Sequence, residues 1–239
     1  AQLLFPNVDK TIEYYEDLYP ERNLDKKAKV TRLGPSPTGF IHLGNLYGAL
    51  VDERIAHLND GTMLLRIEDT DDKRKVEGSE ELIIRSLKFF GIEFDEGVSL
   101  DGEKGIYGPY RQSDRKEIYQ TAAKYLTEKG FTYPSFVSEE EMAIIREEQE
   151  KAGVNTGYYG KWATDRNLSL EEIMANLDAG KPWTLRLKSG GDPEVAMKFK
   201  DGIRGEINVR QNNLDVVILK QNGIPTYHFA HVVDDHFMR

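Results

Sequence analysis

The sequence contains no cysteine. This absence excludes disulfide bonds and all metal sites built from thiolates. Histidine is also scarce, with five in 239 residues, and only His228 and His231 stand at a spacing that shares one helical face. No further ligand set accompanies that pair in the sequence, so no metal site is predicted.

Long apolar runs are missing as well. No stretch approaches the roughly 18 to 20 apolar residues that a membrane-spanning helix needs. Residues 1–25 mix acidic, basic and isolated apolar side chains and do not resemble a signal peptide. We therefore expect a cytoplasmic protein that makes no membrane contact.

Basic residues are too few to balance the acidic ones. The chain has 32 lysines and arginines against 41 aspartates and glutamates, which gives a net charge of −9. This argues against a protein that holds nucleic acid chiefly by bulk electrostatic attraction, although a local basic strip could still position RNA. A hydrophobic content of 39% and a charged content of 31% are typical of a globular protein with a buried core.

What is present is a strand, loop and helix pattern at residues 32–45. A short apolar strand ends at Leu33, and a helix opens near His42. The loop between them contains Gly34, Pro35, Pro37 and Gly39. Such a loop lets backbone approach a ligand closely, and the unpaired N–H groups of the first helical turn favour a phosphate. Neither the dinucleotide pattern G-x-G-x-x-G nor a Walker loop is present, and a purely structural turn is the alternative.

A strand, helix and strand unit surrounds this loop. The helix is predicted to run to about Leu58, and residues 62–67 form a near-continuous apolar run typical of a buried parallel strand. The acidic cluster at residues 68–71 then falls at the carboxyl end of that strand, where open α/β sheets bind ligands. A solvated acidic turn is the alternative interpretation.

The remaining segments alternate in character. A helix is predicted to start at Ser79, whose side chain would cap it, and to stop at Gly91. Residues 97–108 are glycine-rich and predict a loop. Further helices are expected over residues 114–129 and after capping boxes at Ser138 and Ser169. A short helix is expected over residues 10–18 of the N-terminal extension. Strands are expected over residues 132–137, 183–187, 195–199, 205–209 and 216–219.

Helices followed by clustered strands indicate an α+β module inserted into an α/β domain. We predict an N-terminal extension over 1–28, the first half of a Rossmann-like catalytic domain over 29–100, an inserted connective domain over 101–204, and the start of the second half over 205–239. The predicted fold class is therefore α/β, with a Rossmann-like doubly wound parallel sheet interrupted by an α+β insertion. Because such a sheet needs further strands, we expect the domain to be truncated at the C-terminus.

The stretch from Pro35 to Asn45 resembles the P-S-P-T-G-x-x-H-x-G signature of the glutamyl- and glutaminyl-tRNA synthetases, which are class I enzymes. Three more motifs, at residues 66–71, 108–113 and 225–235, are similar to the catalytic region of bacterial-type glutamyl-tRNA synthetases and follow in the same order. The resemblance implies a core with an insertion that binds the tRNA acceptor stem. It also implies ATP-dependent activation of L-glutamate with Mg²⁺ and transfer to tRNA(Glu), and we expect a monomer.

The resemblance also implies roles for single residues. Those implied to bind glutamate are Arg32, Gly34, Ser36, Glu68, Tyr227 and His231. Those implied to bind ATP are His42, Gly44 and Asn45, with His42 and Asn45 also catalytic, and those implied to meet the acceptor end of tRNA are Asp71 and Arg74. The planar guanidinium of Arg32 suits the substrate side-chain carboxylate, which it could take bidentately. The alternatives are a surface ion pair at Arg32, a packed core histidine at His231 and an exposed charged turn at residues 71–74.

The sequence also departs from the family pattern. The KMSKS-type lysine loop and the anticodon-binding domain have no counterpart before Arg239, so we predict a glutamate–tRNA ligase that is weakly active or inactive alone. Residues 133–137 occupy the neighbourhood where some bacterial members hold zinc through cysteines, so no zinc is expected. Two other functions stay open: a glutamyl-Q tRNA(Asp) synthetase-like paralogue, and a non-catalytic RNA- or amino-acid-binding module derived from a synthetase.

Overall fold

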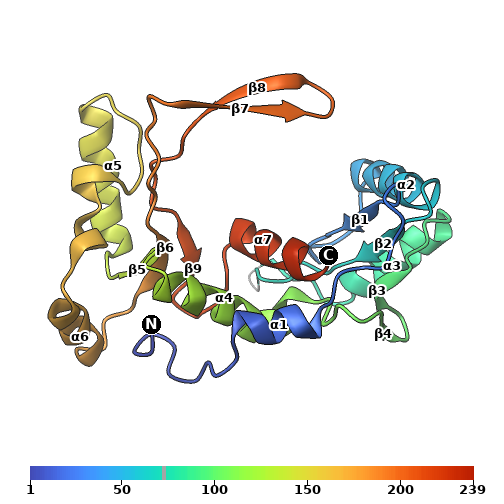
Figure 1. Ribbon diagram of the computed structural model, residues 1–239, viewed down its shortest axis with the longest axis horizontal. Helices are drawn as coiled ribbons and strands as arrows, with labels where there is room; N and C mark the ends of the chain where they lie inside the picture. The colour runs from blue at the N-terminus through green and yellow to red at the C-terminus, as the bar shows by residue number, and fades with distance from the viewer. Residues whose placement is uncertain (72–73) are drawn as a thin grey trace. The chain divides into compact units, whose positions relative to one another are not determined.

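The computed structural model describes residues 1–71 and 74–239 (Figure 1). The chain forms two compact units. We call residues 7–122 with 227–239 the core unit, and residues 1–6 with 123–226 the inserted unit. The chain leaves the core unit once and returns at Tyr227, which is the connectivity of an insertion.

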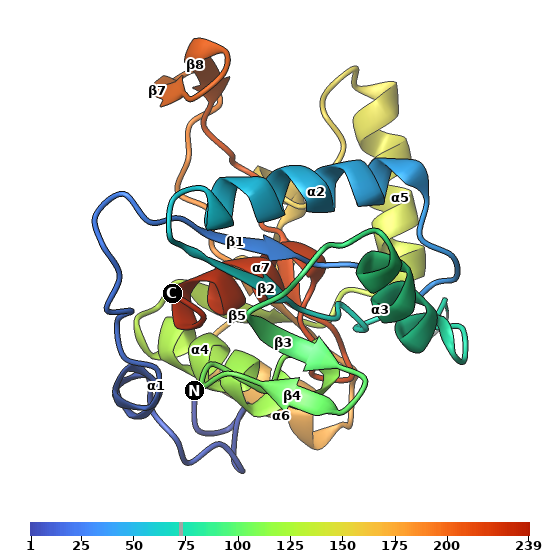
Figure 2. The ribbon, with the colours of Figure 1, turned by 90° about the vertical axis from the view of Figure 1, so that its right-hand side faces the viewer.

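The core unit is built on a four-stranded sheet with the order β1-β2-β3-β4 (Figure 2). Its strands are β1 (Val30–Leu33), β2 (Thr62–Leu65), β3 (Glu96–Ser99) and β4 (Gly102–Lys104). Strands β1, β2 and β3 are parallel, and α2 (Leu43–His57) and α3 (Ser79–Phe89) connect them. Met63, Leu64 and Leu65 are almost fully buried, as the apolar run predicts, so the expected βαβ unit is confirmed.

The prediction of a loop at residues 97–108 is wrong in its first part, because β3 and β4 form an antiparallel hairpin there. The sheet is therefore mixed rather than wholly parallel. Gly97 lies in β3 with φ of 115°, and a Cβ at this position would overlap the backbone of Leu65 in β2. The glycine that suggested a loop thus allows close strand pairing.

The start of α3 also differs from the prediction. Gly78, with φ of 76°, is the N-cap residue, and Ser79 is the first residue inside the helix. The Ser79 hydroxyl donates instead to the carbonyl oxygens of Val76 and Pro37, at 2.6 and 2.8 Å. It therefore anchors the glycine- and proline-containing loop rather than capping the helix.

The other helices of the core unit are α1 (Ile12–Leu18), the 3-10 helix η1 (Gln112–Arg115), the first part of α4 (Lys116–Glu128), and α7 (Tyr227–Phe237). Tyr15 and Tyr19 are buried and pack against Phe237 at the end of α7. The N-terminal extension is thus tied to α7 by aromatic contacts.

The inserted unit combines helices with antiparallel strands. A three-stranded sheet has the order β5-β6-β9, formed by β5 (Thr132–Ser135), β6 (Thr184–Leu187) and β9 (Val217–Leu219). A separate hairpin pairs β7 (Ala196–Asp201) with β8 (Gly205–Arg210). The helical elements are α5 (Glu139–Lys151), α6 (Leu170–Asp178), and the 3-10 helices η2 (Gly160–Trp162) and η3 (Thr164–Asn167). Both predicted capping boxes, at Ser138 and Ser169, are present.

The limits of the two units do not coincide with the predicted boundaries at 101 and 204. Strand β8 pairs with β7 and strand β9 with β6, so residues 205–226 continue the inserted unit. Hydrogen bonds between strands decide this grouping.

No helix in the described part of the chain is long and apolar enough to cross a membrane.

A histidine links α2 to the sheet. His57 Nδ1 lies 2.8 Å from Glu53 Oε1 on α2, and its Nε2 lies 3.0 Å from Asp95 Oδ2 just before β3. Asp95 also accepts from the Met63 amide at 2.8 Å. The hydrogen bonds to Asp95 and then Glu53 raise the pKa of His57, because a protonated ring can donate to both carboxylates.

This linkage predicts a pH-dependent contribution to stability. With the folded-state pKa raised, the contribution is fully present below the unfolded pKa of about 6.5 and is lost as pH rises through the folded value. Replacing His57 by Gln should therefore lower the free energy of unfolding by about 0.5–1 kcal/mol at pH 6, as expected for partly exposed pairs, and by less at pH 9. Urea denaturation at both pH values measures this, with His228→Gln at an exposed position as control. An equal cost at the two pH values contradicts the prediction.

Candidate active site

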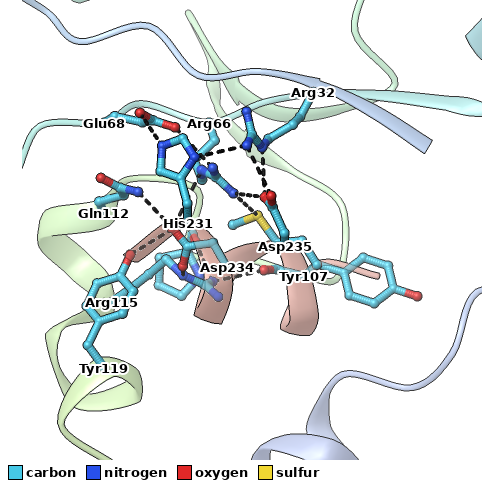
Figure 3. A network of polar contacts seen from close by, with 12 residues as sticks. Arg32, Arg66, Glu68, Tyr107, Gln112, Arg115, Tyr119, His231, Asp234 and Asp235 are labelled. Atoms are coloured by element: carbon cyan, nitrogen blue, oxygen red, sulfur yellow. Dashed lines mark hydrogen bonds and ion pairs between the residues drawn. The ribbon is translucent and has the colours of Figure 1, made fainter. Parts of the chain in front are cut away.

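Three of the four motifs, at residues 66–71, 108–113 and 225–235, meet at one buried carboxylate, that of Asp234 on α7 (Figure 3). Asp234 accepts hydrogen bonds from Arg115 Nε at 2.7 Å, Gln112 Nε2 at 2.9 Å and the Tyr119 hydroxyl at 2.9 Å. Arg66 Nε lies 3.5 Å from the same carboxylate. Asp234 therefore joins the end of β2, the segment around η1 and α4 to α7.

A second layer extends from Arg66, which is fully buried. Its Nη2 donates to Glu68 Oε1 at 3.0 Å, and its Nη1 donates to Asp235 Oδ1 at 2.9 Å. Burial opposes the charge of Arg66, but the carboxylates of Asp234, Asp235 and Glu68 outweigh burial and raise its pKa. Arg66 is thus a permanent cation that aligns three carboxylates.

The network closes through Arg32 on β1 and His231 on α7. Arg32 donates from Nε and Nη2 to the two oxygens of Asp235, at 2.7 and 3.0 Å. Arg32 Nη2 also lies 3.0 Å from His231 Nδ1, and His231 Nε2 lies 2.8 Å from Glu68 Oε2. We call Arg32, His231, Glu68, Arg66 and Asp235 the polar ring, because each contacts the next and Asp235 returns to Arg32.

The charges of the polar ring alternate, which favours the ionised carboxylates. Burial alone would raise the pKa of Asp235, but the hydrogen bonds from Arg32 and Arg66 lower it. In this structure the carboxylate that Arg32 meets bidentately is that of Asp235. A substrate carboxylate would therefore meet a different part of the guanidinium than the fork we expected from the sequence.

Gly34 shows how closely the loop after β1 approaches the ring. A Cβ at this position would overlap Glu68 Oε1 and lie 2.8 Å from Glu68 Cδ. The amide of Glu68 donates to the carbonyl of Pro35 at 3.0 Å, so backbone and side chain together fix Glu68 against the loop. Ser36 lies farther along this loop and is exposed.

The predicted ATP-binding residues lie at the N-terminus of α2. His42 is the N-cap residue, its Nδ1 accepts from the Asn45 amide, and the Asn45 side chain accepts from the His42 amide, both at 3.4 Å. Gly44 lies against the His42 ring, because a Cβ there would come within 3.1 Å of it. The side chains of His42 and Asn45, both predicted to be catalytic, thus form the N-terminal capping box of α2.

The other predicted residues fall on either side of these groups. The Tyr227 ring lies 4.0 Å from the His231 ring, centroid to centroid, and its side chain is more than half exposed. Asp71 and Arg74 form an ion pair of 2.7 Å between two solvent-exposed side chains. The contacts therefore gather Arg32, Gly34, Glu68, Tyr227 and His231 in one place, with His42 paired to Asn45 and Asp71 to Arg74 elsewhere in the core unit.

Three central residues, Arg66, Asp234 and Asp235, lie inside the sequence motifs, but the sequence predicted no role for them. Arg66 is a charged residue inside a buried apolar run, and this was the signal that it needed carboxylate partners. Asp234 and Asp235 are adjacent acids near the end of an amphipathic helix, where neighbouring residues point in different directions. Asp234 accordingly faces the interior, while Asp235 reaches Arg32 and Arg66.

A cavity of about 320 Å³ adjoins the polar ring. Its charged lining residues are Arg32, Arg66, Asp235 and Arg239, and its apolar lining residues are Val30, Leu64 and Met238. Such a lining suits a small molecule that carries charge at its ends. Within residues 1–71 and 74–239, no cluster of three or more histidine, aspartate or glutamate side chains is arranged to hold a metal ion.

Comparison with known proteins gives the class. Residues 29–239 match the family described as tRNA synthetases class I (E and Q), catalytic domain. The chain belongs to this family, and the resemblance seen in the four motifs is confirmed.

Individual relatives are glutamate–tRNA ligases. The chain is 60% identical over 240 residues to the one from Acetivibrio thermocellus, covering 100% of this chain and 44% of the relative. The one from Clostridium beijerinckii is 49% identical over 240 residues, again with 100% of this chain and 43% of the relative covered. The chain thus spans less than half the length of these relatives.

Solved structures agree with the fold. A glutamate tRNA ligase from Elizabethkingia meningosepticum, in complex with its amino acid, superposes with a TM-score of 0.78 and 38% identity over 89% of this chain and 42% of that chain. The glutamate–tRNA synthetase of Elizabethkingia anophelis gives 0.78 and 39% over 88% of this chain and 43% of that chain. The predicted α/β class is confirmed, with the mixed sheet described above.

The close approach at Gly34 predicts a cost for any side chain there. Gly34→Ala should displace the Glu68 carboxylate and lower the free energy of unfolding by about 1–3 kcal/mol, as overpacking does. Gly48→Ala is the matched control, because Gly48 lies within α2 with open space around it, and it should stabilise by up to about 1 kcal/mol through helix propensity. Chemical denaturation compares the two variants. Equal changes in the free energy of unfolding for the two variants would show that the close approach of Gly34 to Glu68 does not constrain the residue at position 34.

The buried ion pairs of Asp234 predict a larger loss of stability when this residue is replaced. Asp234→Asn keeps the shape but removes the charge that compensates buried Arg66 and Arg115, so it should cost about 3–5 kcal/mol of unfolding free energy. Glu81→Gln breaks an exposed pair with Arg85 and should cost no more than about 0.5 kcal/mol. Urea denaturation followed by circular dichroism gives both values. A cost for Asp234→Asn as small as that for Glu81→Gln runs against the prediction.

Proposed function

We propose that this chain provides the catalytic region of a glutamate–tRNA ligase, which activates L-glutamate with ATP and transfers it to tRNA(Glu). Family membership and the names of the relatives support the reaction class. The observation that carries the choice of amino acid is the polar ring, in which His231 stands between the guanidinium of Arg32 and the carboxylate of Glu68. The open alternatives, a paralogue acting on tRNA(Asp) and a non-catalytic module, are less well supported by these relatives.

Glutamate binding requires one cation and one anion. Arg32 meets the side-chain carboxylate of the substrate, and Glu68 pairs with its α-ammonium group. Gly34, Ser36, Tyr227 and His231 complete the pocket around the substrate. A guanidinium suits this role better than an ammonium because it stays charged and keeps its donors in a fixed plane.

ATP binding is assigned to the loop at residues 34–45 and the start of α2. The α-carboxylate oxygen of glutamate attacks the α-phosphorus of ATP, a new P–O bond forms, and the bond to pyrophosphate breaks as pyrophosphate leaves. No general base is needed, because the attacking carboxylate is already ionised. Donors near His42, Gly44 and Asn45 stabilise the charge that builds up on the phosphate oxygens.

Magnesium fits this site as an ion carried by the nucleotide. The Asp235 carboxylate is held by Arg32 and Arg66 and is not offered to a metal. When bound, Mg²⁺ would neutralise charge on the phosphates, as it usually does in nucleotide sites that supply few protein ligands. Zinc has no assigned place in this proposal.

The transfer step follows at the same place. A hydroxyl of the terminal ribose of tRNA attacks the carbonyl carbon of glutamyl-adenylate, and an ester bond forms. The acyl–phosphate bond breaks, AMP leaves, and the hydroxyl proton passes to solvent. We assign Asp71 and Arg74 to the acceptor end and the inserted unit to the acceptor stem. A monomer stays part of this proposal, and the use of ATP and tRNA accords with the cytoplasm.

Calorimetric titration of the 239-residue chain with L-glutamate tests the pocket directly. Saturable binding is expected, at least tenfold tighter than for L-glutamine, which lacks the charge for Arg32. Glutamate-dependent exchange of pyrophosphate into ATP tests activation, and labelled glutamate offered with tRNA(Glu) and tRNA(Asp) tests transfer. Equal binding of glutamate and glutamine, or charging of tRNA(Asp) alone, would overturn the proposal.

Arg32 gives a mutational prediction. Arg32→Ala should weaken glutamate binding at least tenfold, because the side-chain carboxylate loses its cation, and should leave RNA affinity nearly unchanged. Arg85→Ala, on the exposed side of α3, is the control and should change neither. Calorimetry and RNA gel shift provide the two measurements. Loss of RNA affinity with glutamate binding intact would assign Arg32 to nucleic acid instead.

A further inference from the structure

We infer that His231 is a positioning residue, held as the neutral Nε2–H tautomer, that keeps Arg32 and Glu68 apart and available to the amino acid. This inference rests on the proposed function. The His231 side chain is 17% exposed and contacts a different charged group at each ring nitrogen. Nδ1 lies 3.0 Å from Arg32 Nη2, and Nε2 lies 2.8 Å from Glu68 Oε2.

The two partners select one tautomer. A guanidinium nitrogen can only donate, so Nδ1 must accept and cannot carry a proton. An ionised carboxylate can only accept, so Nε2 must donate. Glu68 also accepts a hydrogen bond from Arg66 Nη2, at 3.0 Å, so its carboxylate acts as an acceptor toward both neighbours. In the opposite tautomer, the Nδ1 hydrogen would face a hydrogen of Arg32, and the Nε2 lone pair would face a lone pair of Glu68. A protonated ring would carry a hydrogen on Nδ1 and would lose the contact with Arg32.

The ring also acts as a spacer between opposite charges. Arg32 and Glu68 are separated by the width of one imidazole. Without the ring, the guanidinium and the carboxylate would be free to approach each other and pair directly. Such a pair would occupy both groups that the substrate needs. His231 replaces this direct ion pair with one hydrogen bond to Arg32 and one to Glu68.

A count of hydrogens shows which part of Arg32 remains for a ligand. Asp235 takes the single Nε hydrogen and one Nη2 hydrogen, and His231 takes the other Nη2 hydrogen. Within the described part of the chain, Nη1 is therefore the nitrogen with which Arg32 can meet a further acceptor. His231 and Asp235 together orient the guanidinium so that Nη1 receives the substrate carboxylate.

The tautomer can be measured without any substrate. Nitrogen NMR of ¹⁵N-histidine-labelled chain should show, for the ring that disappears in His231→Ala, a protonated Nε2 and an unprotonated Nδ1 at pH 7.5. A protonated Nδ1 at that pH overturns the inference. This readout is separate from the proposed function, since a wild-type chain that shows the Nε2–H tautomer but binds no glutamate contradicts only that function.

Three substitutions separate positioning from packing. His231→Ala should raise the glutamate dissociation constant at least tenfold while leaving the unfolding midpoint unchanged or higher, because Arg32 and Glu68 can then pair. His231→Asn places an amide near Nδ1 and His231→Gln places one near Nε2, so each should restore part of the affinity. His228→Ala, at an exposed position of α7, should alter neither quantity. Wild-type affinity in His231→Ala, or equal losses of affinity and stability in all three variants, overturns the inference.

Discussion

The structure of the core unit depends on the buried ion pairs around Asp234. Arg66 and Arg115 carry full charges where water does not reach, and the cost of removing those charges from water is offset only by carboxylates with good hydrogen-bond geometry. Asp234 provides this compensation from α7, a helix more than 100 residues away in sequence from the partners it meets. The return of the chain after the insertion is therefore fixed by charge as well as by packing.

The polar ring builds on that arrangement. Because Asp234 and Asp235 are adjacent on α7, fixing the first places the second between Arg66 and Arg32. Arg66 then orients Glu68, and Gly34 leaves room for that carboxylate beside the loop after β1. In the site, the partly exposed side chains of Arg32, His231 and Asp235 thus lie over the buried charges of Arg66, Glu68 and Asp234. Preorganisation of this kind is what a pocket for a small charged substrate requires.

Much of the core unit could be predicted from the sequence because its signals are local. The apolar run of β2 and the loop that opens α2 each depend on neighbours within a few residues, and the same holds for the capping boxes at Ser138 and Ser169 in the inserted unit. The β3 and β4 hairpin was missed for a physical reason. Gly97 is needed because another strand lies against it, and that strand is 32 residues away in sequence.

By itself, the sequence determined most of the strands and helices, the β3 and β4 hairpin excepted, and it placed Glu68 and His231 in motifs of one enzyme family, with Arg32 just before the first motif. Only the tertiary structure decided their partners. Arg32 meets Asp235 rather than standing free, and His231 lies between two charges with one tautomer favoured. The reason is that periodicity and capping act over one or two turns, whereas a buried charge takes its partner from whichever segment packing brings within hydrogen-bond distance.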